Sequence, residues 1–304
     1  MLIQSRILTL ATSFVAWVVV YTNLQNFLHL PHFPWAEPLS FAVFVLFLGY
    51  VAADKVFRDE RRLLALENEL AIAREIQAST LPSSVPEIDN LRIYAAYRPM
   101  TAVAGDFYEF LPVDRQRLGI LVADVSGHGV PAALIAAMIK MAVKSIESCV
   151  QSPGDVLRGL NRMLSEQPPD QFVTAAYLFV DTRNHLARYS AAGHPPLLLL
   201  REGALQRIES NGLVFGAMPE PHYPVYDMPI RPGDRLLLYT DGVIEPQDAG
   251  GESFGERRLE QVVRKNQSCP PAHLVDQLLS EIRLWQPASL PQQDDITLIV
   301  IDIV

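Results

Sequence analysis

The chain has 304 residues, of which 49% are hydrophobic and 19% are charged, and its formal net charge at pH 7 is −9. This length suggests about two folding units with enough apolar material for a sizeable core. The acidic balance excludes the basic surface that is typical of proteins that bind nucleic acid. The two cysteines, Cys149 and Cys269, have neither CxxC spacing nor a neighbouring histidine pair, which excludes a disulfide framework and a structural zinc site.

Two uncharged, apolar stretches open the chain, at residues 7–24 and 38–53. A membrane-spanning helix needs roughly 20 apolar residues, and the positive-inside rule places the ends that carry basic residues in the cytoplasm. Arg6 precedes the first stretch, and several basic residues follow the second. We therefore expect a transmembrane helical hairpin over residues 1–53, in the inner (cytoplasmic) membrane, with the domain that follows it in the cytoplasm. A cleaved signal peptide and a pair of buried core helices are the alternatives.

Residues 54–81 contain no glycine or proline and are rich in Glu, Arg, Leu and Ala, which indicates a long linker helix. Two series repeat every seven positions: Val56, Leu63 and Leu70, and Leu66, Ala73 and Thr80. Such spacing is typical of a coiled coil, which would make the protein a homodimer, and equally of one helix packed on the domain that follows. Both interpretations stay open at this point.

From residue 86 to residue 304 the chain consists of short β-like runs and helical segments separated by turn signals. The predicted strands lie at 91–97, 117–123, 172–181, 185–192, 196–201, 205–209, 225–230, 235–240 and 296–303. The predicted helices lie at 130–148, 153–165, 255–265 and 271–285. Strands in two groups, with helices between and after them, indicate an α+β domain of layered sheets and helices.

Four aspartates stand where predicted strands end or beside a glycine turn: Asp106, Asp124, Asp241 and Asp294. Several carboxylates that converge at strand ends repel one another unless a cation neutralises them. Their hard oxygen atoms are ligands that suit Mg²⁺ or Mn²⁺. Asp before Gly is also common in turns, so turn chemistry is the alternative for each position taken singly. Taken together, the four positions predict a metal centre.

Five motifs follow one another along this part of the chain. They are Ala-Gly-Asp-Phe-Tyr-Glu-Phe at 104–110, Ala-Asp-Val-Ser-Gly-His-Gly-Val-Pro-Ala-Ala at 123–133, Ser-Ala-Ala-Gly-His-Pro-Pro at 190–196, Leu-Tyr-Thr-Asp-Gly-Val-Ile-Glu at 238–245 and Gln-Asp-Asp-Ile-Thr at 293–297. In these motifs the chain resembles the bacterial SpoIIE-type phosphatases, a branch of the metal-dependent type 2C protein phosphatases. The resemblance implies a type 2C-like phosphatase domain over 86–304, a two-sheet β-sandwich flanked by helices in the order αββα.

The resemblance also implies a centre of two metal ions, Mn²⁺ or Mg²⁺. Matched by motif, Asp106 and Asp124 would hold or bridge the ions, with the backbone carbonyl of Val125 as a further ligand. Asp241 and Asp294 would hold the second ion.

Three neighbouring residues are not assigned as ligands. Glu109 stands where Asp is common in the family, and Asp295 stands at a position that is often Asn or Asp. His128 is separated from the preceding aspartate by Ser126-Gly127. We interpret His128 as a turn or helix-start residue rather than as a proton donor.

The implied activity is that of a protein-serine/threonine phosphatase that works by metal-assisted attack of water on a phosphoryl group. The implied substrate is a phosphorylated regulatory protein, such as an anti-sigma-factor antagonist. A diguanylate cyclase is one alternative, because the 104–110 motif superficially resembles the Gly-Gly-Asp-Glu-Phe loop, but Asp124 and Asp241 have no role in it. The other alternative is a membrane-anchored scaffold with a phosphatase-like fold and no turnover, which the complete set of aspartates disfavours.

Overall fold

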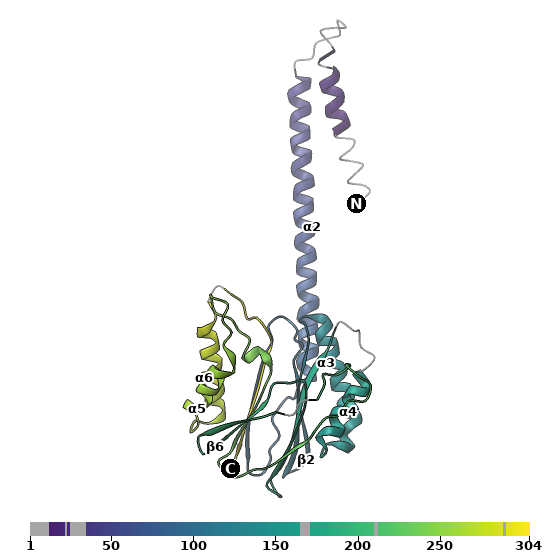
Figure 1. Ribbon diagram of the computed structural model, residues 1–304. Helices are drawn as coiled ribbons and strands as arrows, with labels where there is room; N and C mark the ends of the chain where they lie inside the picture. Colours follow the sequence, from purple (N-terminus) through teal and green to yellow (C-terminus); the bar gives the residue numbers. More distant parts are fainter. Residues whose placement is uncertain (1–11, 22, 25–34, 165–170, 210–211, 288–289) are drawn as a thin grey trace. The chain divides into compact units, whose positions relative to one another are not determined.

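The structure is a computed structural model, and it describes residues 12–21, 23–24, 35–164, 171–209, 212–287 and 290–304. Contacts within the chain divide it into two compact units, Met1–Glu69 and Leu70–Val304. Figure 1 shows that the second unit consists of two stacked sheets with helices on both outer faces.

The described N-terminal residues are helical. Residues 12–21 and 23–24 have helical backbone, and a single long helix, α2, covers Ala36–Thr80. α2 contains the second apolar stretch, 38–53, and continues without a break through the charged residues of the expected linker helix.

The predicted transmembrane hairpin is wrong. Among the described residues, no helix combines the length and the apolar composition that a membrane crossing requires. The apolar stretch 38–53 is shorter than the roughly 20 residues of a span, and it leads directly into Asp54 and Lys55 of the same helix. Residues 7–11 and 22 of the first predicted stretch lie outside the described residues. The membrane location, which depended on the hairpin, is contradicted with it.

The second unit contains two five-stranded sheets in which every neighbouring pair of strands is antiparallel. One sheet has the order β1 (Leu91–Arg98), β10 (Ile296–Ile303), β9 (Arg235–Tyr239), β6 (Leu197–Arg201) and β7 (Ala204–Ile208). The other has the order β2 (Phe107–Asp114), β3 (Arg117–Val125), β4 (Val173–Asp181), β5 (Leu186–Ala192) and β8 (Tyr226–Pro229).

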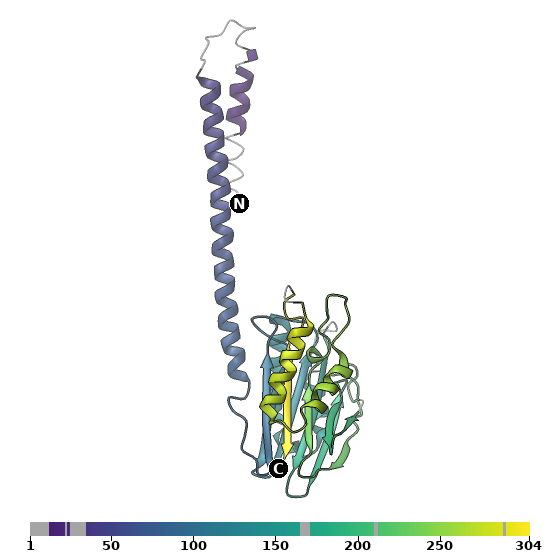
Figure 2. The same cartoon turned by 90° about the vertical axis from the view of Figure 1, so that its left-hand side faces the viewer.

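Helices cover the outer face of each sheet. The helices that follow β3 are α3 (Val130–Val143), the 3₁₀-helix η1 (Lys144–Cys149) and α4 (Pro153–Leu164). The helices that follow β9 are the 3₁₀-helix η2 (Asp241–Val243), α5 (Gly255–Lys265) and α6 (Pro271–Trp285). Figure 1 shows α3 and α4 on one side of the sandwich and α5 and α6 on the other, and Figure 2 shows α6 against the sheet that contains β10. The predicted two-sheet sandwich flanked by helices is confirmed.

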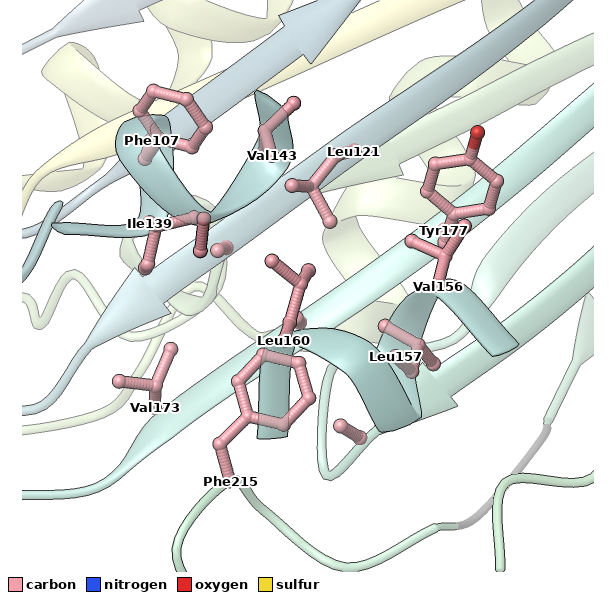
Figure 3. Close-up of a cluster of buried hydrophobic side chains, with 14 of the residues drawn as sticks. Phe107, Leu121, Ile139, Val143, Val156, Leu157, Leu160, Val173, Tyr177 and Phe215 are labelled. Carbon is pink, nitrogen blue, oxygen red and sulfur yellow. The ribbon is translucent and has the colours of Figure 1, made fainter. Parts of the chain in front are cut away.

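Three buried apolar layers explain why the strands read as nearly continuous hydrophobic runs. In β3, Leu121 and Ala123 face the layer under α3 and α4, whereas Ile120 and Val122 face the layer between the two sheets. A strand that is buried on both faces loses the polar alternation of a half-exposed strand. Figure 3 shows the layer under α3 and α4, in which Leu160 of α4 is one of the labelled side chains.

Two segments differ from the sequence-based expectation. β2 was not expected because Glu109 and Pro112 interrupt its apolar run. The helix expected over 130–148 ends as an α-helix at Val143 and continues as the 3₁₀-helix η1.

The layer under α3 and α4 yields a stability prediction. Leu160 is fully buried, so Leu160→Ala should lower the free energy of unfolding by about 2–5 kcal/mol, because it removes apolar contacts and leaves a cavity. Met163 lies on the same helix with 45% of its surface exposed, and Met163→Ala should change that free energy by about 0.5 kcal/mol or less. Urea unfolding followed by circular dichroism measures both, and equal losses would contradict the assigned burial.

Candidate metal centre

The pairing of β2 with β3 brings the first two aspartates to one end of their sheet. Phe107, at the start of β2, lies opposite Ala123, near the end of β3. Asp106 directly precedes Phe107, and Asp124 directly follows Ala123. The two carboxyl groups therefore come from adjacent strands that run in opposite directions.

The pairing of β9 with β10 does the same for the other two aspartates. Tyr239, at the end of β9, lies opposite Leu298, near the start of β10. Asp241 follows β9 by two residues, and Asp294 precedes β10 by two residues. Both therefore lie where the same two strands of the second sheet meet.

Asp106 joins the two sheets at this end. Its Oδ2 accepts hydrogen bonds from the hydroxyls of Thr240 (2.8 Å) and Thr297 (2.6 Å), which belong to the other sheet's strand ends. Thr297 also donates its backbone N–H to the Thr240 hydroxyl at 2.9 Å. Burial, and then the charge of Asp124, raise the pKa of Asp106 well above its usual range, while the two hydroxyls oppose that rise.

A compact acidic cluster forms beside these strand ends. Asp241, Glu245 and Asp294 each place a carboxylate oxygen within 4.8 Å of the others. Gly242 allows this approach, because a Cβ added there would lie 1.8 Å from the backbone oxygen of Asp295. Burial raises the pKa of Asp294 to about 6, with the charge of Asp241 contributing.

Asp124 is electrostatically coupled to this cluster. Burial raises its pKa from 3.8 to about 8, and the charges of Asp241, Asp294, Asp295 and Glu245 add to the rise. The four predicted aspartates are thus brought together at one end of the sandwich, where burial first and neighbouring carboxylates second raise the pKa values of Asp106 and Asp124.

Asp295 has a role different from that of a free carboxylate. It is buried, and its two oxygens accept the backbone N–H groups of Met100 (2.6 Å) and Gly105 (2.7 Å). Gly105 packs against the predicted ligand Val125, because a Cβ there would lie 2.7 Å from the Val125 carbonyl oxygen. Asp295 therefore holds the loop that precedes Asp106, and this loop packs against the backbone that follows Asp124.

Glu109 and His128 have different neighbours. Glu109 forms an ion pair with Lys140 of α3, so it ties β2 to that helix. His128 is exposed, and its charge lowers the pKa of Asp294, so it lies near the acidic cluster.

Three residues of the site were not predicted from the sequence: Thr240, Thr297 and Glu245. Each stands inside a motif that the sequence analysis identified. The four-residue spacing of Asp241 and Glu245 was a usable signal, because it matches one helical turn. Nothing local indicated that two threonine hydroxyls would converge on Asp106, since that contact joins residues 134 and 191 positions apart.

The residues fit divalent cations. Three carboxylate oxygens within 4.8 Å of one another and a buried aspartate with a pKa near 8 are a costly arrangement without a compensating positive charge. Carboxylate and carbonyl oxygens are the ligands that Mg²⁺ and Mn²⁺ prefer.

The raised pKa of Asp124 predicts a pH dependence of stability without metal. Its neutral form is favoured by folding, so this contribution to stability is complete below about pH 4 and is lost as the pH rises toward about 8. In EDTA, the melting temperature should fall between about pH 6 and about pH 8.5, and Asp124→Asn should reduce that fall. Calorimetry at both pH values measures the melting temperatures of the wild-type and Asp124→Asn proteins. Equal falls in melting temperature in the two proteins would refute the electrostatic coupling of Asp124 to the acidic cluster.

The chain was compared with known proteins. Residues 114–304 match the family described as Stage II sporulation protein E (SpoIIE). Over 268 residues the chain is 31% identical to the phosphoserine phosphatase RsbU of Bacillus subtilis (strain 168). The alignment covers 86% of this chain and 78% of RsbU.

Solved structures show the same fold. The SiaA-PP2C domain of Pseudomonas aeruginosa matches with a TM-score of 0.72 and 23% identity, over 80% of this chain and 99% of that domain. The catalytic domain of the serine threonine protein phosphatase PstP, solved with two manganese ions, matches with a TM-score of 0.50 and 18% identity, over 70% of this chain and 98% of that domain. The family match and the identity to RsbU together show that this chain belongs to the SpoIIE family of metal-dependent, type 2C phosphatases.

Proposed function

We propose that this chain hydrolyses phosphoserine or phosphothreonine on a regulatory protein at a centre of two divalent cations, through a domain over residues 86–304. The observation that carries the proposal is the convergence of acidic side chains from both sheets at one end of the sandwich. The relative RsbU is named a phosphoserine phosphatase, which supports phosphoserine as the substrate group.

The proposed ligands combine predicted residues with one that the structure adds. They are Asp106, Asp124, Asp241, Glu245, Asp294 and the backbone carbonyl of Val125. When bound, Mn²⁺ or Mg²⁺ supplies the Lewis acidity that activates a water molecule and stabilises negative charge on the phosphoryl oxygens.

The chain's own residues supply position and access. The hydroxyls of Thr240 and Thr297 fix the orientation of Asp106, so its carboxylate does not have to be ordered when the ions bind. Glu245 and His128 are exposed, which leaves the acidic cluster accessible from solvent. A phosphorylated side chain on the surface of another protein could therefore reach the centre.

The substrate that we propose is a phosphorylated regulatory protein of the anti-sigma-factor antagonist class. Membership of the SpoIIE family supports this choice. The net charge of −9 would repel a negatively charged phosphoryl group, so bound cations would also serve to attract that group.

The metal ligands yield the first activity prediction. Asp124→Ala and Asp241→Ala should each lower Mn²⁺-dependent hydrolysis of p-nitrophenyl phosphate by at least about 100-fold, because each removes a ligand. Asp276→Ala, which removes an exposed carboxylate from α6, is the matched control and should keep the wild-type rate. A wild-type rate of hydrolysis in either ligand variant would contradict the proposed metal centre. A phosphoserine peptide then tests the substrate class.

We also propose that α2 pairs with α2 of a second copy. Val56, Leu63 and Leu66 belong to the seven-residue series and are exposed by 63%, 61% and 54%. A continuous helix that exposes apolar side chains at this spacing is suited to a coiled coil.

The pairing predicts a dimeric mass for the full chain in light scattering. Leu63→Glu places a charge in the repeat and should convert the dimer to a monomer, because a coiled-coil seam disfavours unpaired charge. Leu64→Glu is the control, since Leu64 is exposed by 57% but stands outside both series. A monomeric wild-type chain would overturn the pairing.

A further inference from the structure

One of the five sequence motifs supplies none of the proposed metal ligands. It is Ser-Ala-Ala-Gly-His-Pro-Pro at residues 190–196, which contains the last residues of β5 and the connection from β5 to β6 in the other sheet. His194 lies in this connection and is buried, with 8% of its surface exposed. Buried polar side chains are normally hydrogen-bonded, so the contacts of His194 indicate its role.

His194 makes one well-defined hydrogen bond, which joins its Nδ1 to the hydroxyl oxygen of Thr174 in β4 at 2.9 Å. Burial lowers the pKa of His194 to about 3, so the ring is uncharged at neutral pH. The backbone of Tyr239 opposes this fall in part, without forming a well-aligned hydrogen bond to Nε2. His194 therefore does not supply the positive charge that the acidic side chains require, and its distinctive contact is the one with Thr174.

Thr174 is the neighbour of Asp124 in the sheet, because the two residues lie opposite each other where β3 pairs with β4. Val125 and Val173, the next residues along the two strands, face the layer under α3 and α4. Side chains alternate along a strand, so those of Asp124 and Thr174 both face the other side of this sheet. Opposite residues on one face have Cβ atoms about 5 Å apart. The Thr174 hydroxyl is therefore within reach of the Asp124 carboxylate if its side chain turns.

A hydrogen bond from Thr174 would move Asp124 in an unfavourable direction. Within the part of the chain that the structure describes, no side chain donates to the Asp124 carboxylate, whereas Asp106 receives two hydroxyls from the other sheet. β3 lies between β2, which Asp106 precedes, and β4, which carries Thr174. A bond to Thr174 would thus draw the Asp124 carboxylate toward β4, away from Asp106 and from the strand ends that Asp106 contacts.

We infer that His194 is a positioning residue of the metal centre: by holding the Thr174 hydroxyl, it keeps that hydroxyl from bonding to Asp124 and leaves the Asp124 carboxylate directed toward the other proposed ligands. This inference rests on the proposed function of the centre. Neither His194 nor Thr174 is a ligand in it.

The presence of His194 decides which partner the hydroxyl takes. Without His194, the Thr174 hydroxyl would favour the ionised Asp124 carboxylate, because hydrogen bonds to charged acceptors are stronger than those between neutral groups. With His194 present, that exchange is disfavoured, because it would leave the buried Nδ1 without a partner in addition to Nε2.

The test compares His194→Leu with His194→Asn in the full chain by calorimetric titration with Mn²⁺. Leucine and asparagine have nearly the same size and shape, but only the amide of asparagine can hydrogen-bond to Thr174 from near the position of Nδ1. His194→Leu should weaken Mn²⁺ binding by about 10–100-fold, the usual effect of losing a group that orients a metal ligand. His194→Asn should bind Mn²⁺ nearly as tightly as the wild-type chain. Equal Mn²⁺ affinities of the two variants would overturn the inference.

A second substitution separates positioning from a loss of packing. Thr174→Val keeps nearly the shape of the side chain and removes the hydroxyl. Adding it to His194→Leu should restore most of the lost Mn²⁺ affinity, because the hydroxyl that would bond to Asp124 is gone, so the two changes should be strongly non-additive. A double variant that binds Mn²⁺ no better than His194→Leu would overturn the inference, since a cavity at residue 194 would then explain the loss.

Asn161→Leu is the control for replacing a buried polar side chain. Asn161 of α4 is fully buried, donates to the carbonyl oxygens of Met218 and Pro219 and accepts the backbone N–H of Gly216. Asn161→Leu should lower the melting temperature, because it leaves these groups unsatisfied, and should not change the Mn²⁺ affinity. A loss of affinity equal to that of His194→Leu would show a general effect of destabilisation and overturn the inference.

His194→Gln decides the question if His194→Leu does not fold. Its amide reaches the position of Nε2 rather than that of Nδ1, so it keeps a polar group in the cavity but loses the bond to Thr174. It should therefore weaken Mn²⁺ binding by about 10–100-fold relative to His194→Asn. An affinity equal to that of His194→Asn would overturn the inference.

Hydrolysis of p-nitrophenyl phosphate separates this inference from the proposed function. A wild-type chain that binds Mn²⁺ without turnover would refute the phosphatase proposal, and the Mn²⁺ affinities of the His194 variants would still decide the inference. A wild-type chain that binds no Mn²⁺ would overturn both.

Discussion

Repulsion between carboxylates that are largely withdrawn from water is the constraint on which the catalytic end of this protein depends. Six acidic side chains meet there: Asp106, Asp124, Asp241, Glu245, Asp294 and Asp295. Two of them are buried, three are partly buried and Glu245 is exposed, so part of the cost of ionising the group falls on the folded state. The rise in the pKa of Asp124 to about 8 is a consequence of that cost. A site of this kind is stable in its ionised form only with a compensating positive charge.

Uncharged hydrogen-bond donors of the surrounding structure stabilise two of these carboxylates. Asp106 receives two threonine hydroxyls, and Asp295 receives two backbone N–H groups. These two carboxylates are thereby fixed in orientation, while Asp241, Glu245 and Asp294 remain close together beside them. Asp295 thus holds a loop, whereas Asp106 is oriented by its two hydrogen bonds and remains a proposed ligand. Gln77 of α2 also forms two hydrogen bonds with the backbone of Ala104, two residues before Asp106.

Much of the fold could be predicted because its elements have strong local signals. α5, α6 and β10 begin and end at the predicted residues, since glycine, proline and apolar runs mark their limits. The four aspartates were identified because strand ends and glycine turns are visible in sequence. β2 was not predicted because Glu109 and Pro112 interrupt its apolar run, whereas the run of β3 is uninterrupted over residues 118–123.

Other features depend on tertiary contacts that sequence patterns do not contain. The hydrogen bonds of Gln77 to Ala104 join residues 27 positions apart, and those of Asp295 reach 190 and 195 positions back. The membrane hairpin failed for a related reason. Apolar composition at 38–53 does not by itself distinguish a membrane span from the first part of a long helix that continues into charged residues.

We propose that the convergent carboxylates form a centre for two divalent cations. Anomalous diffraction from crystals of the full chain grown with Mn²⁺ tests this proposal. We expect two manganese peaks per chain, one of them in contact with Asp241 and Asp294 and at least one in contact with Asp124. The absence of manganese from this end of the sandwich in crystals grown with saturating Mn²⁺ would contradict it.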